Sequence, residues 1–94
     1  MSLEVLVTKY IISAERVLKD IQQTKGTINV TEENVVKILD YVTNYLEDAK
    51  YYKAQERLET SLTSVAYCEG LLDALRLLGA VKFEWPTKRE RKQF

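Results

Sequence analysis

The chain has 94 residues, of which 46% are hydrophobic and 30% charged, with three Gly, one Pro, one Cys and no His. This length allows one small domain, and this composition is too apolar for a disordered chain and too charged for a membrane-spanning one. Without His, the common Ser/His and Cys/His nucleophile pairs and the usual Cys/His zinc sites are excluded.

The 14 basic and 14 acidic residues balance overall but are unevenly placed. Residues 82–94 hold five basic and two acidic residues, a net charge of +3, which leaves 9 basic and 12 acidic residues, a net of −3, in residues 1–81. A single cysteine cannot form an internal disulfide, and no basic leader with an apolar run opens the sequence, so we expect a cytoplasmic protein. The longest apolar stretch, residues 70–81, is interrupted by charges and too short to cross a membrane.

The first predicted element is an amphipathic helix over residues 2–25. Apolar residues recur there at spacings of three and four, and Lys25 followed by Gly26 is typical of a helix end. Its apolar stripe consists of Leu3, Leu6, Tyr10, Ala14, Val17 and Ile21. Residues 26–30 are predicted to be a connecting loop.

A second helix is predicted to begin after Thr31 as N-cap, with Glu32 and Glu33 in its first turn. Asn34 at the third helical position predicts an incomplete capping box. The helix should end near Lys53, with Val35, Ile38, Val42, Tyr45, Ala49 and Tyr52 on its apolar face.

No Gly or Pro marks the end of the second helix, so one helix of nearly fifty residues is the alternative to a hairpin. A turn at residues 54–56 is favoured because it buries the apolar stripe that follows. The third helix should end at Gly79 and place Leu58, Leu62, Val65, Cys68, Leu72 and Leu75 in the core. Gly70 within it indicates a close approach of another helix.

Residues 81–85 alternate apolar and charged side chains before Pro86, which predicts an extended segment laid on the helices. Residues 87–94 should be mobile or partly helical. The sequence therefore predicts an all-α fold, an up-down-up three-helix bundle over residues 1–81 with an extended, basic and aromatic C-terminal tail over residues 82–94.

The most unusual local feature is a stripe of Tyr41, Tyr45, Asp48 and Tyr52 at one margin of the second helix. These rings could stack on a planar ligand, or they could cover the seam of the bundle, and the second interpretation is favoured. In the third helix Glu69, Asp73 and Arg76 share a stripe, which favours an ion pair over a divalent-cation site completed by Asp48.

Asp48 and Asp73 should lie about 16 Å apart along a hairpin and so cannot share an ion. Each is therefore predicted to be a structural hydrogen-bond acceptor, whose truncation lowers stability by about 1 to 3 kcal/mol if buried. Cys68 lies among apolar positions and is predicted to be a core residue rather than a nucleophile.

Two paired motifs, Tyr45-x-x-Asp48-Ala49-x-x-Tyr52 and Tyr67-x-x-Gly70-x-Leu72-Asp73-Ala74, stand in the second and third helices, and Leu78-Gly79 follows. They resemble the short archaeal proteins grouped as domain of unknown function 357, over roughly residues 33–81. The resemblance implies a three-helix bundle and no established activity, substrate or cofactor. Family members often have Gly-Asp at the hairpin break, where this chain has Glu56-Arg57.

The leading functional hypothesis is a non-catalytic helical interaction module without cofactor or metal, which forms a homodimer through the third helix or the Phe83 and Trp85 segment. Its candidate interaction face consists of Tyr45, Asp48, Tyr52, Tyr67, Asp73, Phe83 and Trp85. The alternative is nucleic-acid or ribonucleoprotein binding through Lys88, Arg89, Arg91 and Lys92 beside Trp85 and Phe94. An enzyme that uses Asp48, Glu69 and Asp73 ranks last, because so small a bundle has little room for a pocket.

Overall fold

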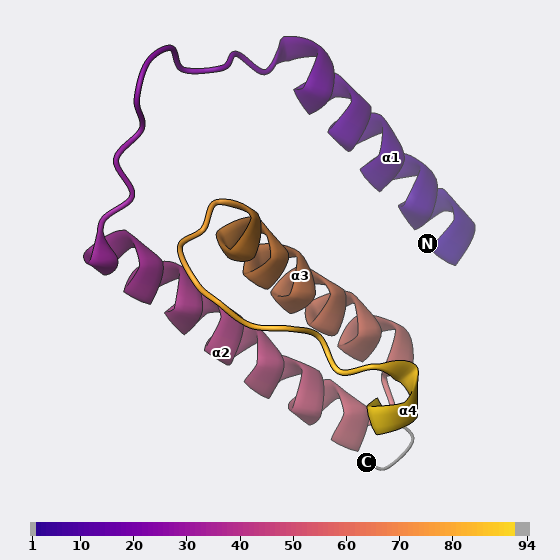
Figure 1. The fold of residues 1–94 in the computed structure, drawn as a ribbon. Helices are drawn as coiled ribbons and strands as arrows, with labels where there is room; N and C mark the ends of the chain where they lie inside the picture. Colours follow the sequence, from indigo (N-terminus) through magenta and orange to yellow (C-terminus); the bar gives the residue numbers. More distant parts are fainter. Residues whose placement is uncertain (1, 92–94) are drawn as a thin grey trace.

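The computed structural model describes residues 2–91 and contains four helices in this range: α1 (Leu3–Asp20), α2 (Glu32–Ala54), α3 (Leu58–Leu77) and the short α4 (Lys88–Arg91). No strand occurs among the described residues. The all-α class is confirmed, and the three long helices alternate in direction, up-down-up, as predicted (Figure 1).

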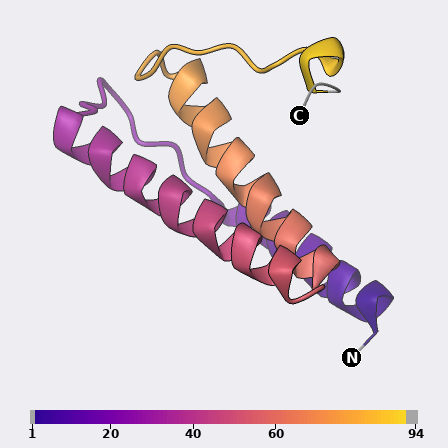
Figure 2. The same cartoon turned by 90° about the horizontal axis from the view of Figure 1, so that it is seen from below.

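The packed part of the molecule is the hairpin formed by α2 and α3, which lie side by side in both views (Figures 1 and 2). Its interior consists of Val42 and Ala49 from α2 and Cys68 and Leu75 from α3. Ser61 donates a hydrogen bond of 2.7 Å to the carbonyl oxygen of Ala49. Small residues at this contact let the two backbones approach closely.

Helix α1 stands apart from the hairpin (Figure 1). No Cα atom of α1 lies within 8 Å of a Cα atom of α2 or α3, and none of its residues is buried. The sequence predicts a core shared by three helices, but the core of the chain is formed by α2 and α3 alone.

The start of α1 agrees with the prediction, and its C-terminal end does not. At its start, Ser2 accepts a hydrogen bond of 3.1 Å from the backbone N–H of Val5. The helix ends at Asp20, five residues before the predicted end at Lys25, because Ile21 is already extended at φ −63° and ψ 137°. Residues 22–24 are Gln, Gln and Thr, which extend the apolar stripe of α1 by no side chain, so a further turn would gain little stability. Gly26, at φ +88°, instead forms a bend inside the loop of residues 21–31.

The predicted incomplete capping box of α2 is wrong. Asn34 performs the role of the usual Glu or Gln, since its Oδ1 accepts from the backbone N–H of Thr31 at 3.4 Å. In return, the hydroxyl of Thr31 accepts from the backbone N–H of Asn34 at 3.1 Å. The amide side chain is long enough to reach back to the cap.

The predicted turn between α2 and α3 is confirmed. The backbone N–H of Arg57 donates to Tyr52 at 2.9 Å and that of Glu56 to Lys53 at 3.0 Å, which is a Schellman motif with Glu56 at φ 61°. The end of α3 uses the same motif with Gly79 at φ +77°. The left-handed position of this motif is thus taken by the preferred glycine after α3 and by a glutamate after α2.

Two predictions for the third helix need correction. Leu58 and Leu62 are exposed, not core, because Ser61, which bonds to Ala49, occupies the side of α3 that faces α2, Leu62 projects about 100° away from it, and α1 does not reach them. A Cβ built at Gly70 would meet no atom within 4 Å, so no helix of this chain approaches that glycine.

Candidate functional site

The C-terminal segment is held against α3 by Asp73, Arg76, Phe83 and Trp85, which we call the tail latch. The indole N–H of Trp85 donates to Oδ1 of Asp73 at 2.8 Å. Arg76 donates to the same oxygen through its NH2 group at 3.2 Å. The rings of Phe83 and Trp85 meet edge to face at 5.0 Å, and the Arg76 guanidinium lies 5.8 Å from the centre of the Phe83 ring.

The latch determines the electrostatics of Asp73. The hydrogen bond from Trp85 lowers the pKa of this carboxyl below its ordinary value, with a further lowering by Arg76. Asp73 is therefore a hydrogen-bond acceptor for Arg76, as predicted. Sequence reasoning missed Trp85 as its stronger partner, although a part-covered indole N–H generally needs an acceptor.

A second cluster, which we call the tyrosine face, consists of Tyr41, Tyr45 and Tyr52 on α2 and Tyr67 on α3. The rings of Tyr45 and Tyr67 lie 4.6 Å apart at 46°. The Arg57 guanidinium lies 4.9 Å from the centre of the Tyr52 ring. Tyr67 and Arg76 are nine residues apart and project to opposite sides of α3 at about 100° per residue. The tyrosine face and the tail latch therefore occupy opposite sides of the hairpin.

Asp48 does not join Asp73. It is exposed, and no described residue donates a hydrogen bond to it, so the prediction that it is a structural acceptor is not met among residues 2–91. No group of three His, Cys, Asp or Glu side chains within residues 2–91 could hold a metal ion.

Cys68 is buried, and its thiol donates to the carbonyl oxygen of Val42 at 3.3 Å. Burial raises the pKa of the thiol, and the charges of Asp48 and Glu69 raise it further. A protonated and covered thiol is a poor nucleophile, which agrees with a core role for Cys68.

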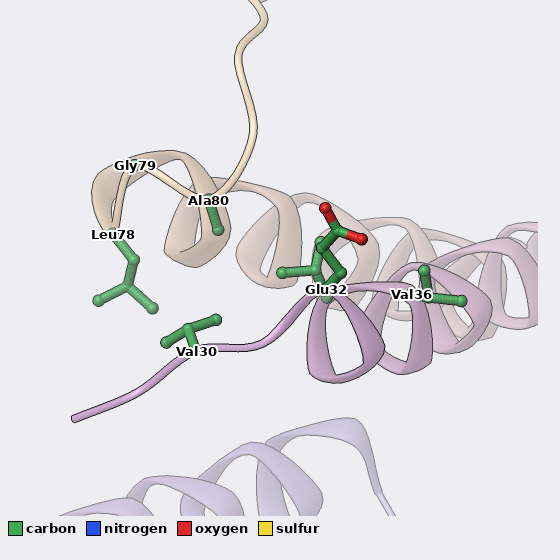
Figure 3. A pocket seen from close by; sticks show the side chains of 7 residues that line it. Val30, Glu32, Val36, Leu78, Gly79 and Ala80 are labelled. Carbon is green, nitrogen blue, oxygen red and sulfur yellow. The ribbon is translucent and has the colours of Figure 1, made fainter.

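The open end of the hairpin contains a hollow of about 430 Å³ (Figure 3). The side chains of Val30 and Leu78 approach each other across its mouth, and Glu32 supplies its one ionisable group. Asp48, Glu69 and Asp73 do not line it. The carboxylates singled out in the sequence therefore do not share this hollow.

The basic residues of the tail fall in or beyond α4. Lys88 and Arg89 are exposed, Arg91 belongs to the same short helix, and Lys92 lies outside the described residues. Trp85, the predicted stacking ring beside them, is engaged in the tail latch. None of the helices within residues 2–91 has the length and apolar character needed to cross a membrane.

Comparison with known proteins adds one result. Neither curated proteins nor solved structures give a match to the chain. Residues 9–81 match the family described as Protein of unknown function (DUF357). The match begins inside α1, earlier than the motifs in α2 and α3 indicated, and it ends before Phe83 and Trp85. With most of its length covered from α1 to the end of α3, the chain belongs to this family.

Proposed function

We propose that this protein is a non-catalytic helical module that acts by self-association. The observation that carries the proposal is α1, whose nine large apolar side chains have exposed fractions from 39% to 73%. Soluble monomers rarely expose contiguous apolar patches larger than a few hundred Å². A partner protein surface would remove this area from water.

The outer side of α3 adds to this surface. Leu62, Tyr67, Leu77 and Leu78 are all exposed there. Phe83 and Trp85, the other predicted interface segment, are half-buried in the tail latch and so contribute less. The proposed interface is therefore formed by helices rather than by the tail.

A non-catalytic role is supported by the distribution of reactive groups. Cys68 is covered and kept protonated. The hollow at the end of the hairpin has Glu32 but no second acid or base beside it in its lining. A larger hollow next to it is lined by Arg76, Lys82 and Glu84, but it is open to solvent rather than enclosed. General acid–base chemistry usually needs a pair of positioned groups.

Sedimentation equilibrium of the full chain over low to high micromolar concentrations tests the proposal. We expect a species of twice the chain mass of 10.9 kDa to increase with concentration. A clean monomer across the whole range would show that the exposed helices do not mediate self-association.

A second candidate is nucleic-acid binding through the tail, which is supported by the exposed Lys88 and Arg89 on α4. It ranks lower for two reasons. The indole of Trp85 is hydrogen-bonded to Asp73, and the sequence pI of about 6.3 is far below the basic pI that is usual for nucleic-acid-binding domains. Titration of short RNA and DNA at low salt, with and without residues 87–94, tests it. Equal affinity of the two chains would exclude the tail as the contact.

A further inference from the structure

The tail latch is formed by the side chains of an extended segment. Val81, Phe83 and Trp85 are half-buried, whereas the two charged residues between them are exposed. No backbone group of residues 81–86 forms a hydrogen bond with the backbone of another described residue. The side of α3 that holds this segment therefore recognises every second side chain of an extended chain, as surfaces that bind extended peptides do.

The receiving surface is formed by α3 itself. Asp73 and Arg76 are three residues apart on this helix and pair with each other at 3.2 Å. Their carboxylate accepts the indole N–H of Trp85 at 2.8 Å, and their guanidinium lies 5.8 Å from the centre of the Phe83 ring. This surface therefore selects an indole donor and, two residues before it, an aromatic ring.

The surface continues beyond the tail toward the start of α3. The contacts of Phe83 and Trp85 show that the tail runs back along α3 from the C-terminal end of the helix. At about 100° per residue, Leu62 projects within about 20° of Asp73, and Leu58 lies one turn further on. The two leucines are 70% and 62% exposed, respectively. They form an uncovered apolar continuation of the surface that the tail occupies.

The tail of the chain does not cover these leucines. Leu62 lies about 16 Å along α3 from Asp73, which is the length of about five extended residues. Residues 87–91, which follow Trp85 at this distance, are Thr, Lys, Arg, Glu and Arg, all polar. In Figure 2 the tail turns away from the hairpin, and no Cα atom of α4 lies within 8 Å of a Cα atom of α2 or α3. The tail thus fills one half of an apolar surface and leaves the other half in water.

We propose that this side of α3 is a docking site for an extended segment of a partner protein, and that the tail of the chain occupies the site in competition with that segment. The fitting segment has an aromatic residue, a tryptophan two residues later and a large apolar residue about five residues after the tryptophan. It repeats the contacts of Phe83 and Trp85 and covers Leu62 as well.

The additional contact is what permits displacement of the tail. Five residues connect the end of α3 at Leu77 to Phe83, so the tail has a high effective concentration at the site. A segment that only copies the tail competes poorly, whereas one that also buries Leu62 gains further apolar contact. The site does not depend on self-association, which we assign chiefly to α1.

Fluorescence anisotropy of labelled peptides tests the docking site. One peptide has the sequence of residues 81–92, and a second carries Glu90→Leu, five residues after the tryptophan. The receiver is the full chain with Phe83→Ala and Trp85→Ala, which releases the latch. We expect both peptides to bind this receiver, the Glu90→Leu peptide about fivefold more tightly. Each should bind the parent chain about tenfold more weakly or less, because the tail fills the site.

Further substitutions in the receiver assign the contacts. Leu62→Gln should abolish the advantage of the Glu90→Leu peptide and leave the affinity for the unmodified peptide unchanged. Asp73→Ala should weaken both peptides several-fold, because the indole loses its acceptor. Asp48→Ala is the matched control and should change neither affinity, since Asp48 lies beside Tyr45 on the other side of the hairpin. Circular dichroism checks that each receiver remains helical.

Three results would overturn the docking site. The first is no binding of either peptide to the released receiver up to millimolar concentration. The second is equal affinity for the parent and released chains, because the tail would then not compete. The third is an advantage of the Glu90→Leu peptide that survives Leu62→Gln, which would place its contact elsewhere, for example on α1. A chain that binds as expected but sediments as a monomer would overturn self-association alone.

Discussion

Helices α1 and α2 are both amphipathic and both carry an N-cap hydrogen bond, yet of the two, α2 alone packs against another described helix. The face of α2 is covered by α3, which buries Val42 and Ala49. The face of α1 remains in water. The difference shows that an apolar stripe predicts a helix and a contact surface, but not which molecule supplies the other half.

The connections on either side of α2 help to explain this difference. Three residues join α2 to α3, and eleven join α1 to α2. By loop-closure entropy, the longer connection costs only about 1 kcal/mol more to close. Loop length alone therefore does not keep α1 away, and an apolar helix on such a tether is free to pack wherever the contact is largest.

The largest expected effect comes from truncating one apolar side chain on each side of this comparison. Leu75 is 1% exposed, so Leu75→Ala should lower the free energy of unfolding by about 3 kcal/mol at any protein concentration. Leu18→Ala in α1 should lower the melting temperature only where the protein is a dimer. Thermal melts followed by circular dichroism at several concentrations measure both.

An equal loss for Leu18→Ala at all concentrations would contradict this comparison, because it would place α1 in a core within the single chain.

A smaller loss is expected at the close contact of the hairpin. Ser61→Ala removes the 2.7 Å hydrogen bond to Ala49 and should cost about 1 kcal/mol. Ser64→Ala is the matched control, because its hydroxyl forms no hydrogen bond with the described residues, and it should change the unfolding midpoint much less. Urea unfolding of the two variants side by side gives the comparison. If the two losses are equal, the Ser61 bond does not hold the helices together.

Relief of backbone strain in the α2–α3 turn should raise the free energy of unfolding, by an amount similar to or smaller than the loss in Ser61→Ala. Glu56 occupies the left-handed region at φ 61°, which costs a non-glycine residue about 1 to 2 kcal/mol. Glu56→Gly removes this strain but frees the unfolded chain, so a net gain of about 0.5 to 1 kcal/mol is expected. Thermal unfolding measures it. Gln55→Gly at φ −87° is the control and should destabilise the protein.

The sequence predicted the helices and the hairpin turn because these depend on local periodicity, capping and the burial of one stripe. Thr31 and the turn near Gln55 are examples. The turn formed where expected, and it is a Schellman motif although Glu56 occupies the position usually taken by glycine. The partner of α1 was not predictable. A helix of the same chain and a helix of another copy could each cover its apolar stripe equally well. For the same reason Leu58 and Leu62 were wrongly assigned to the core.

The candidate residues divide in a similar way. Asp73 and Arg76 are neighbours within one helix, so their pairing followed from spacing alone. The contact of Asp73 with Trp85 joins positions twelve residues apart around the end of α3, and no periodicity relates an extended segment to a helix. Asp48 was grouped with Tyr45 and Tyr52 by periodicity, yet it faces solvent because no part of residues 2–91 covers it.

The smallest expected effect is a pH response of the tail latch, the contact that holds the C-terminal segment against α3. The pKa of Asp73 is lowered, chiefly by the hydrogen bond from Trp85, so the latch is favoured by the charged carboxylate. The stabilisation is complete above the ordinary Asp pKa of about 3.9 and is lost as the pH falls through the lower pKa of the folded state. The latch should therefore hold from neutral pH to about pH 5 and loosen below about pH 4.

Trp85 is the only tryptophan, so its fluorescence reports the latch directly. Acid titration of the full chain should shift the emission of Trp85 to longer wavelength in that window, as the ring becomes hydrated. Asp73→Asn keeps an oxygen that can accept from the indole but carries no charge, so this variant should lack the step. Asp48→Ala should titrate like the parent, since Asp48 accepts no hydrogen bond from the described residues. A step of the same size in Asp73→Asn would assign the response to another carboxylate and would contradict the role of Asp73 in holding the tail.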